Sequence, residues 1–310
     1  MASIIEGIVG HQKQKQQLLS MIHDQALPFS FIFYGNEGVG KKQLVRGLVQ
    51  VLNCKKSEIA CGTCSDCTRS KEDKNEFIYE ITLEKKKLIS VEQVRELHKF
   101  LSLKTLNATR IVIIDPADQL SKAASNSLLK VLEEPPPKTY FFLITSKLSS
   151  LLPTIRSRSQ ILRFEKLSHQ ELATISDVNQ TAVDWAGGRY DYAKQLLEDE
   201  TIGYLNDSLN LFYSLLCTEP QDWKKLAPWF FTQDEWQNFC FHIWFQALEK
   251  RAYGQSDNLE WIPEDTAEIA VIFDKVEDFR SDISKNVDKL LAMENFYYKL
   301  QGEQGVGSWN

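Results

Sequence analysis

Apolar residues in the first half of the chain follow two alternating patterns. Short, nearly continuous apolar runs predict buried strands, and they lie at Phe29–Tyr34, Phe77–Leu83, Arg110–Ile114, Tyr140–Thr145 and Ile161–Phe164. Between them, apolar residues recur at helical spacing, which predicts helices over 12–24, 41–52, 90–101 and 123–134. Ser90 and Gln93 have the spacing of a capping box at the start of the third helix. This alternation is typical of a parallel sheet with helices on both faces.

From about Glu165 the pattern predicts helices only. Residues 169–200 form short helical segments around a Gly187-Gly188 turn, and residues 206–310 form longer helices rich in Trp, Phe and Tyr. The fold class predicted is therefore α/β plus all-α. The predicted domains are an α/β domain at 1–165, a small helical domain at 166–205 and a larger helical domain at 206–310.

Residues 35–42 read Gly-Asn-Glu-Gly-Val-Gly-Lys-Lys and follow a predicted strand directly. Gly35, Gly40 and Lys41 match the phosphate-loop pattern G-x-x-x-x-G-K-[ST], and Gly38 adds a further flexible position. A helix begins at Lys41, so loop amides and a helix N-terminus would face an anion. The last position is Lys42, whose ammonium cannot ligate Mg²⁺ as a hydroxyl would. Lys41 and Lys42 still predict an electropositive site for phosphate or nucleotide, with binding of ATP or ADP left open.

Four cysteines, Cys54, Cys61, Cys64 and Cys67, form the pattern C-x6-C-x2-C-x2-C. Four thiolates at such spacing close a tetrahedral shell around zinc, with no position open for water. The prediction is a structural zinc module. Disulfide or redox chemistry is the alternative. Two further cysteines, Cys217 and Cys240, lie in aromatic-rich helical sequence and are predicted to be core thiols.

Composition limits the function classes. The 310 residues are 43% hydrophobic, without an apolar run of about 18 residues, so a cytoplasmic location is expected. Residues 206–310 contain 9 Lys and Arg against 18 Asp and Glu, a balance of −9, whereas residues 1–205 contain 27 and 24, a balance of +3. An acidic C-terminal region disfavours nucleic acid there. The N-terminal part could touch a phosphate backbone, but a balance of +3 is a weak signal, and ordinary solvated surface is the favoured explanation of its charge.

These motifs occur in the order found in AAA+ clamp-loader subunits, which the chain resembles over residues 5–200. After the phosphate loop and the cysteine module come Ile111–Asp115, then Asn-Ser-Leu-Leu-Lys-Val-Leu-Glu-Glu-Pro-Pro at 126–136, and then Ser157-Arg158-Ser159. The Leu-Leu-Lys-x-Leu-Glu-Glu-Pro-Pro string is specific to that group. The resemblance implies a P-loop-type sheet domain with an inserted zinc module, a helical lid and a C-terminal helical collar.

Three departures from the family's ATPases argue against turnover. Lys42 replaces the hydroxyl of the metal site. Asp115 supports Mg²⁺ in that family, but Pro116 stands where the family has the glutamate that activates water. The arginine that senses the γ-phosphate corresponds to Tyr192.

The resemblance also implies a role for Arg158. In clamp-loader subunits the Ser-Arg-Cys motif presents its arginine to the nucleotide of the neighbouring subunit, and here the motif reads Ser157-Arg158-Ser159. Such a finger stabilises charge on the transferring phosphoryl group. A surface or ion-paired arginine is the alternative. Arg156 is either a helper of Arg158 or a surface residue.

The implied function is a non-hydrolysing subunit of a sliding-clamp loader that completes the ATP site of an adjacent motor subunit with Arg158. Its partners would be the other clamp-loader subunits, the sliding clamp and primed DNA. Two alternatives are an ATP-hydrolysing motor subunit and a stand-alone zinc-containing DNA-binding module. The aromatic residues of the predicted collar suit both a packed core and a subunit interface, and the sequence does not say which residue serves which. These aromatic residues are Trp229, Phe230, Phe231, Trp236, Phe239, Phe241, Trp244 and Phe245.

Overall fold

The computed structural model describes residues 5, 7–57, 59–71, 78–84, 88–102, 109–175, 178–217, 220–231, 234–255, 258–285 and 287–302. The chain divides into two compact units, Met1–Ala193 and Lys194–Asn310. The finer division into three domains stays a prediction. Among the described helices, none is long and apolar enough to cross a membrane.

The first unit contains a parallel five-stranded sheet with the strand order β2-β3-β4-β1-β5. Its strands are β1 (Ser30–Gly35), β2 (Ile78–Ile81), β3 (Arg110–Ile114), β4 (Thr139–Thr145) and β5 (Gln160–Phe164). All five predicted strands are thereby confirmed, although Phe77 of the second lies outside the described residues. β3 is buried along its whole length because helices cover both faces of the sheet.

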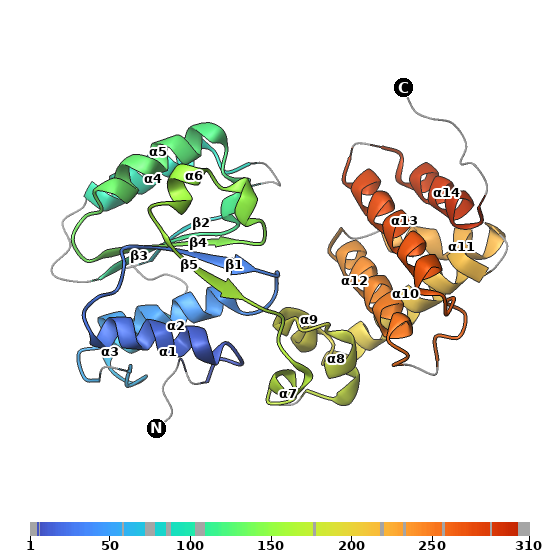
Figure 1. Ribbon diagram of the computed structural model, residues 1–310, viewed down its shortest axis with the longest axis horizontal. Helices are drawn as coiled ribbons and strands as arrows, with labels where there is room; N and C mark the ends of the chain where they lie inside the picture. Colours follow the sequence, from blue (N-terminus) through green and yellow to red (C-terminus); the bar gives the residue numbers. More distant parts are fainter. Residues whose placement is uncertain are drawn as a thin grey trace. The chain divides into compact units, whose positions relative to one another are not determined.

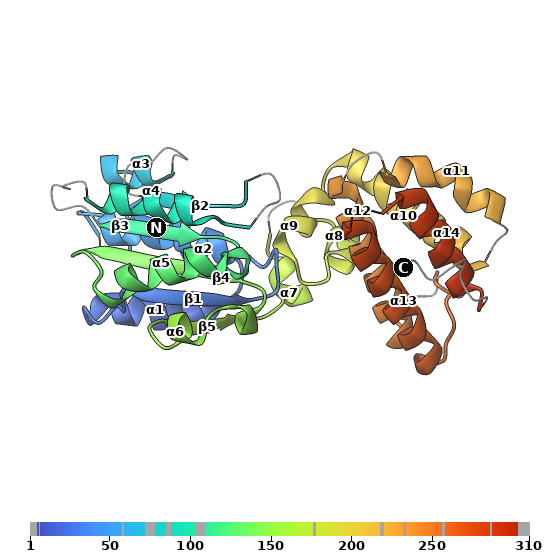
Figure 2. The ribbon, with the colours of Figure 1, turned by 90° about the horizontal axis from the view of Figure 1, so that it is seen from above.

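Helices cover the sheet in two layers (Figures 1 and 2). On one face lie α1 (Gln12–His23), α2 (Lys41–Asn53) and α3 (Ser65–Lys71), and on the other lie α4 (Val91–Ser102), α5 (Lys122–Glu133) and α6 (Pro153–Arg156). Successive strand residues serve the two layers in turn. Phe31 and Phe33 pack in the core between the sheet and α2, whereas Ile32 packs in the core between the sheet and α5. Two single-turn helices, η1 (Ala117–Gln119) and η2 (Leu148–Ser150), follow β3 and β4.

The capping box predicted at the start of α4 is present. The Ser90 backbone N–H donates to Gln93 Oε1 at 3.0 Å, and the Gln93 N–H donates to Ser90 Oγ at 3.3 Å. Ser121 caps α5 by accepting from the Ala124 N–H at 3.2 Å. Side-chain oxygens at these positions satisfy backbone donors that the first helical turn leaves unpaired.

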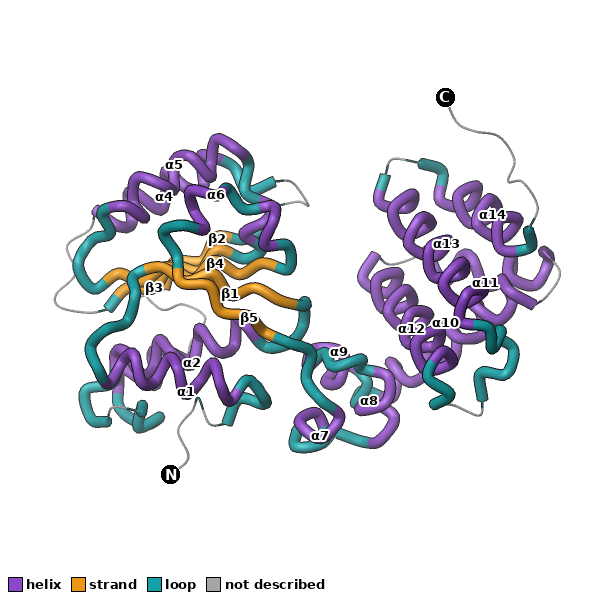
Figure 3. Tube along the Cα trace, in the orientation of Figure 1, coloured by secondary structure: helices purple, strands orange, loops and turns teal. Residues whose placement is uncertain are grey.

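Three short helices follow the sheet: α7 (His169–Leu172), α8 (Gln180–Trp185) and α9 (Tyr190–Gln195) (Figure 3). Ser168 and Glu171 form a capping box at α7. The glycine turn before α9 packs tightly on the chain after β5, because the Leu167 N–H donates to the Gly188 carbonyl oxygen at 2.9 Å. This contact fixes the start of α9.

Every element among the described residues of the second unit is a helix, as predicted. The unit consists of α10 (Asp199–Cys217), α11 (Pro220–Phe231), α12 (Asp234–Ala252), α13 (Thr266–Ser284) and α14 (Lys289–Leu300). Its core is aromatic, and the largest fully buried side chains are Trp223, Trp244, Phe212, Phe230, Phe239 and Phe296. Of the predicted collar aromatics, Phe230, Phe239, Phe241 and Trp244 are buried, whereas Trp229, Phe231, Trp236 and Phe245 remain partly accessible.

The prediction of core thiols is right for Cys240 and wrong for Cys217. Cys240 is buried within α12, and burial raises the pKa of its thiol to about 12. Cys217 is exposed because it is the last residue of α10, where the helix leaves the core. Its Sγ lies 3.5 Å from the Trp261 carbonyl oxygen.

Candidate functional site

The loop between β1 and α2 has a backbone that only glycine adopts easily. Gly35, Gly38 and Gly40 have φ values of +149°, +70° and +93°. A Cβ at Gly35 would lie 1.9 Å from the Phe164 carbonyl oxygen, and one at Gly38 would lie 1.9 Å from Asp191 Oδ1. The loop is therefore enclosed between β5 and the start of α9.

Lys41, the first residue of α2, is bonded to the loop itself. Its Nζ donates to the carbonyl oxygen of Gly35 at 2.7 Å and to that of Asn36. Burial lowers the pKa of Lys41, and the carboxylates of Asp115 and Glu37 partly oppose that shift. The ammonium is therefore satisfied inside the loop in this structure.

Lys42 forms an ion pair with Glu80 of β2. Arg46, one turn further along α2, approaches the same carboxylate at 3.5 Å. Burial raises the pKa of Asp115 at the end of β3, and the Lys42 ammonium is the strongest of the charges that lower it. Lys42 therefore places a fixed positive charge beside two carboxylates at the carboxyl ends of neighbouring strands.

A cavity of about 380 Å³ opens beside the loop. It is lined by residues 37–43, by Asp115 and Pro116 after β3, by Ile144, Thr145 and Ser146 at the end of β4, and by Arg189, Tyr190 and Asp191. The structure thus brings together the predicted residues Gly38, Gly40, Lys41, Lys42 and Asp115. Gly35 does not line the cavity, but its carbonyl oxygen accepts from the Lys41 ammonium.

Arg189 is the cavity residue that the sequence reasoning missed. Its Nε and Nη2 donate to the two carboxylate oxygens of Asp191 at 3.0 and 2.6 Å, and its guanidinium lies 3.9 Å from the centre of the Tyr192 ring. The Tyr190 N–H donates to the Gly38 carbonyl oxygen at 2.7 Å, which brings α9 against the phosphate loop. Tyr192 is itself buried, with Arg189 over its ring. Its correspondence to the family's sensor arginine stays a prediction. The sequence did offer a signal for Arg189, because it follows the Gly187-Gly188 turn directly.

The residues present do not fit a Mg²⁺–nucleotide complex. The charged side chains lining the cavity are the cations Lys41, Lys42 and Arg189 and the carboxylates Glu37, Asp115 and Asp191. These three cations and three carboxylates balance in formal charge, and each cation already donates to a carbonyl or carboxylate oxygen. An ammonium stands where the metal ligand is required. Pro116 offers no acid–base group.

Arg158 lies in the turn after α6, with its side chain about one third exposed. Its Nη2 donates to Glu133 Oε1 at 2.6 Å, and its Nη1 donates to the Thr154 carbonyl oxygen at 3.0 Å and to Ser157 Oγ at 3.4 Å. Arg156 is more enclosed, and its Nε is buried with no hydrogen-bond partner among the described residues. The role of Arg158 as a finger stays a prediction.

The four cysteines of the predicted zinc module converge. The Sγ atoms of Cys54, Cys61, Cys64 and Cys67 all lie within 4.8 Å of one another, and none forms a disulfide. Backbone N–H groups point at three of the sulfurs: Cys61 N to Cys54 Sγ at 3.3 Å, Cys64 N to Cys61 Sγ at 3.4 Å and Cys67 N to Cys64 Sγ at 3.4 Å. Such donors stabilise thiolates, the form that binds zinc.

The surroundings of the thiols shift their pKa values in opposite directions. N–H donors of Thr63 and Cys64 lower the pKa of Cys61 to about 6, whereas burial raises the pKa of Cys67 to about 12. The donor set and its convergence fit a closed structural zinc site.

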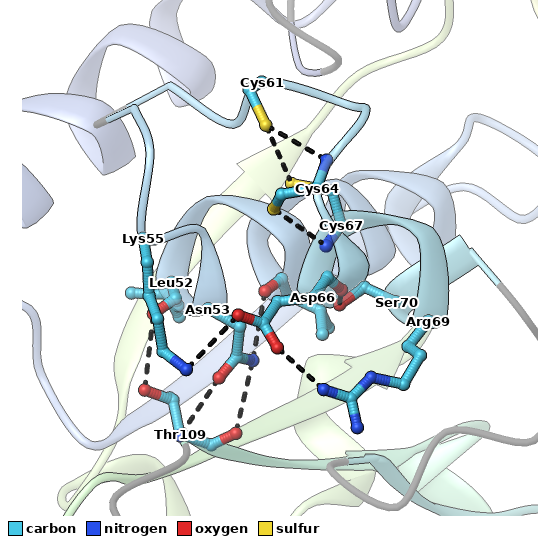
Figure 4. Close-up of polar contacts among 11 residues, drawn as sticks. Leu52, Asn53, Lys55, Cys61, Cys64, Asp66, Cys67, Arg69, Ser70 and Thr109 are labelled. Carbon is cyan, nitrogen blue, oxygen red and sulfur yellow. Dashed lines mark hydrogen bonds and ion pairs between the residues drawn. The ribbon is translucent and has the colours of Figure 1, made fainter.

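A polar network ties this module to the sheet (Figure 4). Asp66 of α3 is buried and pairs with Lys55 Nζ at 3.4 Å and with Arg69 Nη2 at 2.9 Å. Asn53, the last residue of α2, accepts from the Thr109 N–H at 3.0 Å and donates to the Thr109 carbonyl oxygen at 3.3 Å. The cysteine module is thereby connected through the C-terminus of α2 to the start of β3.

Comparison with known proteins gives a family match over the sheet domain. A model of the family "DNA polymerase III, delta subunit" matches residues 10–168, half of the chain. The DNA polymerase III subunit delta' of Haemophilus influenzae is 31% identical over 188 residues, covering 57% of this chain and 58% of that protein. The tau/gamma subunit of the same organism is 30% identical over 169 residues, covering 54% of this chain and 24% of that one. The chain thus matches little more than half the length of the first and a quarter of the second.

A solved structure agrees with the fold over nearly the whole chain. A DNA polymerase III gamma subunit-related protein from Thermotoga maritima superposes with a TM-score of 0.53 at 16% identity, covering 93% of this chain and 99% of that one. At this identity the likeness concerns the fold alone. The predicted AAA+ fold, a parallel P-loop sheet followed by helical domains, is confirmed.

Proposed function

The chain belongs to the DNA polymerase III delta subunit family, and on that premise we propose that it acts as the non-hydrolysing delta prime subunit of a sliding-clamp loader. Its partners would be the gamma/tau ATPase and delta subunits, and through the assembly the sliding clamp and primed DNA. The relatives named delta' support this assignment within the family.

The observation that favours a non-hydrolysing role is the ion pair between Lys42 and Glu80. It places an ammonium at the position of the Mg²⁺ ligand and engages that ammonium with a carboxylate of the neighbouring strand. Without a metal ligand here and without a base at Pro116, the chain lacks two groups that ATP hydrolysis needs. The phosphate loop then serves as a rigid part of the sheet domain.

Arg158 is the group that we assign to the reaction of the neighbouring subunit. Its guanidinium would lie against the transferring phosphoryl group and stabilise the charge that develops on its oxygens. A guanidinium is always charged and offers several N–H donors in one plane, so it needs no proton transfer to act. Ser159 in place of the family's cysteine leaves this chemistry unchanged.

Zinc would have a structural role in this chain. Cys54, Cys61, Cys64 and Cys67 would hold one ion in a closed shell, which supplies no open position for a reactant. Its effect would be to fix the segment between α2 and α3 against the sheet.

The experiment is ATP hydrolysis by a loader reconstituted from this chain with its cognate gamma/tau and delta subunits, clamp and primed DNA. Arg158→Ala should lower kcat by about 10³-fold at the ATP site that this chain completes, as for other arginine fingers. Lys41→Ala should leave kcat nearly unchanged. Gel filtration of each assembly controls for loss of binding.

The second candidate is an ATP-hydrolysing motor subunit, which the similarity to tau/gamma favours. It predicts the reverse result, a loss of turnover with Lys41→Ala and none with Arg158→Ala.

A further inference from the structure

We propose that Glu133 is a positioning residue for Arg158: its carboxylate holds the guanidinium in the direction from which it acts on the neighbouring subunit's nucleotide. The inference rests on the proposed function, since it assigns a second residue to the same site. It concerns a side chain that would not itself touch the nucleotide.

The geometry shows a guanidinium fixed from two sides. Glu133 is the last residue of α5, and its Oε1 accepts from Arg158 Nη2 at 2.6 Å, a distance typical of a charge-assisted hydrogen bond. On the other side the Thr154 carbonyl oxygen accepts from Nη1 at 3.0 Å. Arginine has five N–H donors. A third bond runs from Nη1 to Ser157 Oγ at 3.4 Å, so two N–H donors remain that can meet phosphate oxygens.

The position of Glu133 on its helix is electrostatically unfavourable without Arg158. The C-terminus of a helix carries a partial negative charge, so acidic side chains there are disfavoured and cations are favoured. α5 nevertheless ends in Glu133, followed by Glu134. Arg158 supplies the compensating cation to Glu133, whereas Glu134 is exposed and has no ion pair in the described part of the chain. The two neighbouring glutamates therefore differ in this one contact.

A purely structural role explains the pair less well. Both side chains are partly exposed, at 35% for Arg158 and 50% for Glu133, and ion pairs of this kind add little to folding stability. What the contact does provide is restriction of a long, flexible side chain to one arrangement. A preorganised group loses less entropy when it meets the transition state, so the contact should raise kcat rather than the free energy of unfolding.

The test compares Glu133→Gln with Glu134→Gln in the reconstituted loader, alongside Arg158→Ala and the double variant Glu133→Gln/Arg158→Ala. ATP turnover is measured for kcat and KM, and assembly is checked by gel filtration. We expect Glu133→Gln to lower kcat by about tenfold with KM unchanged, because one charged hydrogen bond to the guanidinium is weakened. Glu134→Gln should match the unmodified chain. The double variant should be no slower than Arg158→Ala alone, because Glu133 acts only through Arg158.

The outcomes separate this inference from the proposed function. If Arg158→Ala lowers kcat but Glu133→Gln does not, the positioning role is wrong and the finger stands. If Glu133→Gln raises kcat, Glu133 restrains Arg158 rather than presenting it, and the inference is overturned. If the double variant is much slower than Arg158→Ala, Glu133 acts by another route. If Arg158→Ala has no effect, the proposed function itself fails.

Discussion

At position 42 a single side chain changes what a phosphate loop offers. In the motif the residue is Ser or Thr, a neutral metal ligand. Lys42 instead pairs with Glu80, and its charge partly offsets the rise that burial causes in the pKa of Asp115. The positive charge that a bound Mg²⁺ would bring to this site is thus supplied by the Lys42 ammonium. Two carboxylates at adjacent strand ends would attract a divalent ion if that ammonium were removed.

Replacing Lys42 by threonine should therefore open the site to metal. In the unmodified chain, binding of a fluorescent ADP analogue, followed by anisotropy, should be weak and insensitive to Mg²⁺. Lys42→Thr restores the hydroxyl and leaves Glu80 and Asp115 without their ammonium, so Mg²⁺ should tighten ADP binding by about tenfold or more. Lys42→Met is the matched control, because it removes the charge without adding a ligand. Mg²⁺-dependent binding by the unmodified chain would contradict this account of Lys42.

At the scale of elements, the five strands and the helices α1, α2, α4 and α5 could be predicted, because the strands are nearly continuous apolar runs and these helices repeat apolar residues at helical spacing. β3 is one example: the sequence expects Arg110–Ile114 and the structure has the same bounds. The short helices α3 and α6 lack such a repeat and were not predicted. The convergence of the cysteines was also predictable, since their spacing admits few geometries.

The contacts around these elements could not be predicted, because they join residues that are remote in sequence. Glu80 of β2 pairs with Lys42 of α2, and Glu133 at the end of α5 pairs with Arg158, which follows α6. Arg189 lines the cavity beside Tyr190, whose N–H donates to the Gly38 carbonyl oxygen of the phosphate loop. Cys217 was placed wrongly because a helix period does not reveal where the helix leaves the core.

His11 connects two of these elements. It precedes α1, and its Nε2 lies 2.7 Å from the Val39 carbonyl oxygen of the phosphate loop, with its ring against Phe164. Nε2–H must therefore be the donor. Burial lowers the pKa of His11, and Lys15 and Lys41 act in the same direction, whereas the Val39 bond and Glu171 oppose it.

This shift predicts a loss of stability at acid pH. Between the unfolded pKa of about 6.5 and the lower folded value, the unfolded chain binds more protons than the folded one. The free energy of unfolding should consequently decrease as the pH falls from above 6.5 through that range. Urea unfolding at pH 7.5 and 5.5 measures the difference, which should be smaller in His11→Asn. His23→Asn, at an exposed histidine, is the control and should keep the full difference. Equal pH dependence in all three chains would rule out His11 as the source.

At the scale of the whole molecule, the two compact units have separate cores and separate spectroscopic probes. The cysteine module belongs to the first unit, Met1–Ala193, where α3 packs on α2. Six of the seven tryptophans belong to the second, and Trp185 belongs to the first. Tryptophan fluorescence therefore follows the second unit, whereas far-UV circular dichroism follows the helices of both.

Removing zinc should destabilise one unit and spare the other. Zinc binding contributes folding free energy wherever its ligands are brought together only in the folded state. Heating the zinc-loaded chain with a chelator should therefore add an earlier transition in circular dichroism, lower by about 10 °C, while the midpoint followed by tryptophan fluorescence stays unchanged. Cys64→Ser should reproduce this pattern without chelator, and Cys217→Ser, at an exposed thiol outside the module, should not. A fluorescence midpoint that falls together with the circular dichroism would mean that the units unfold as one, and that zinc stabilises the entire chain.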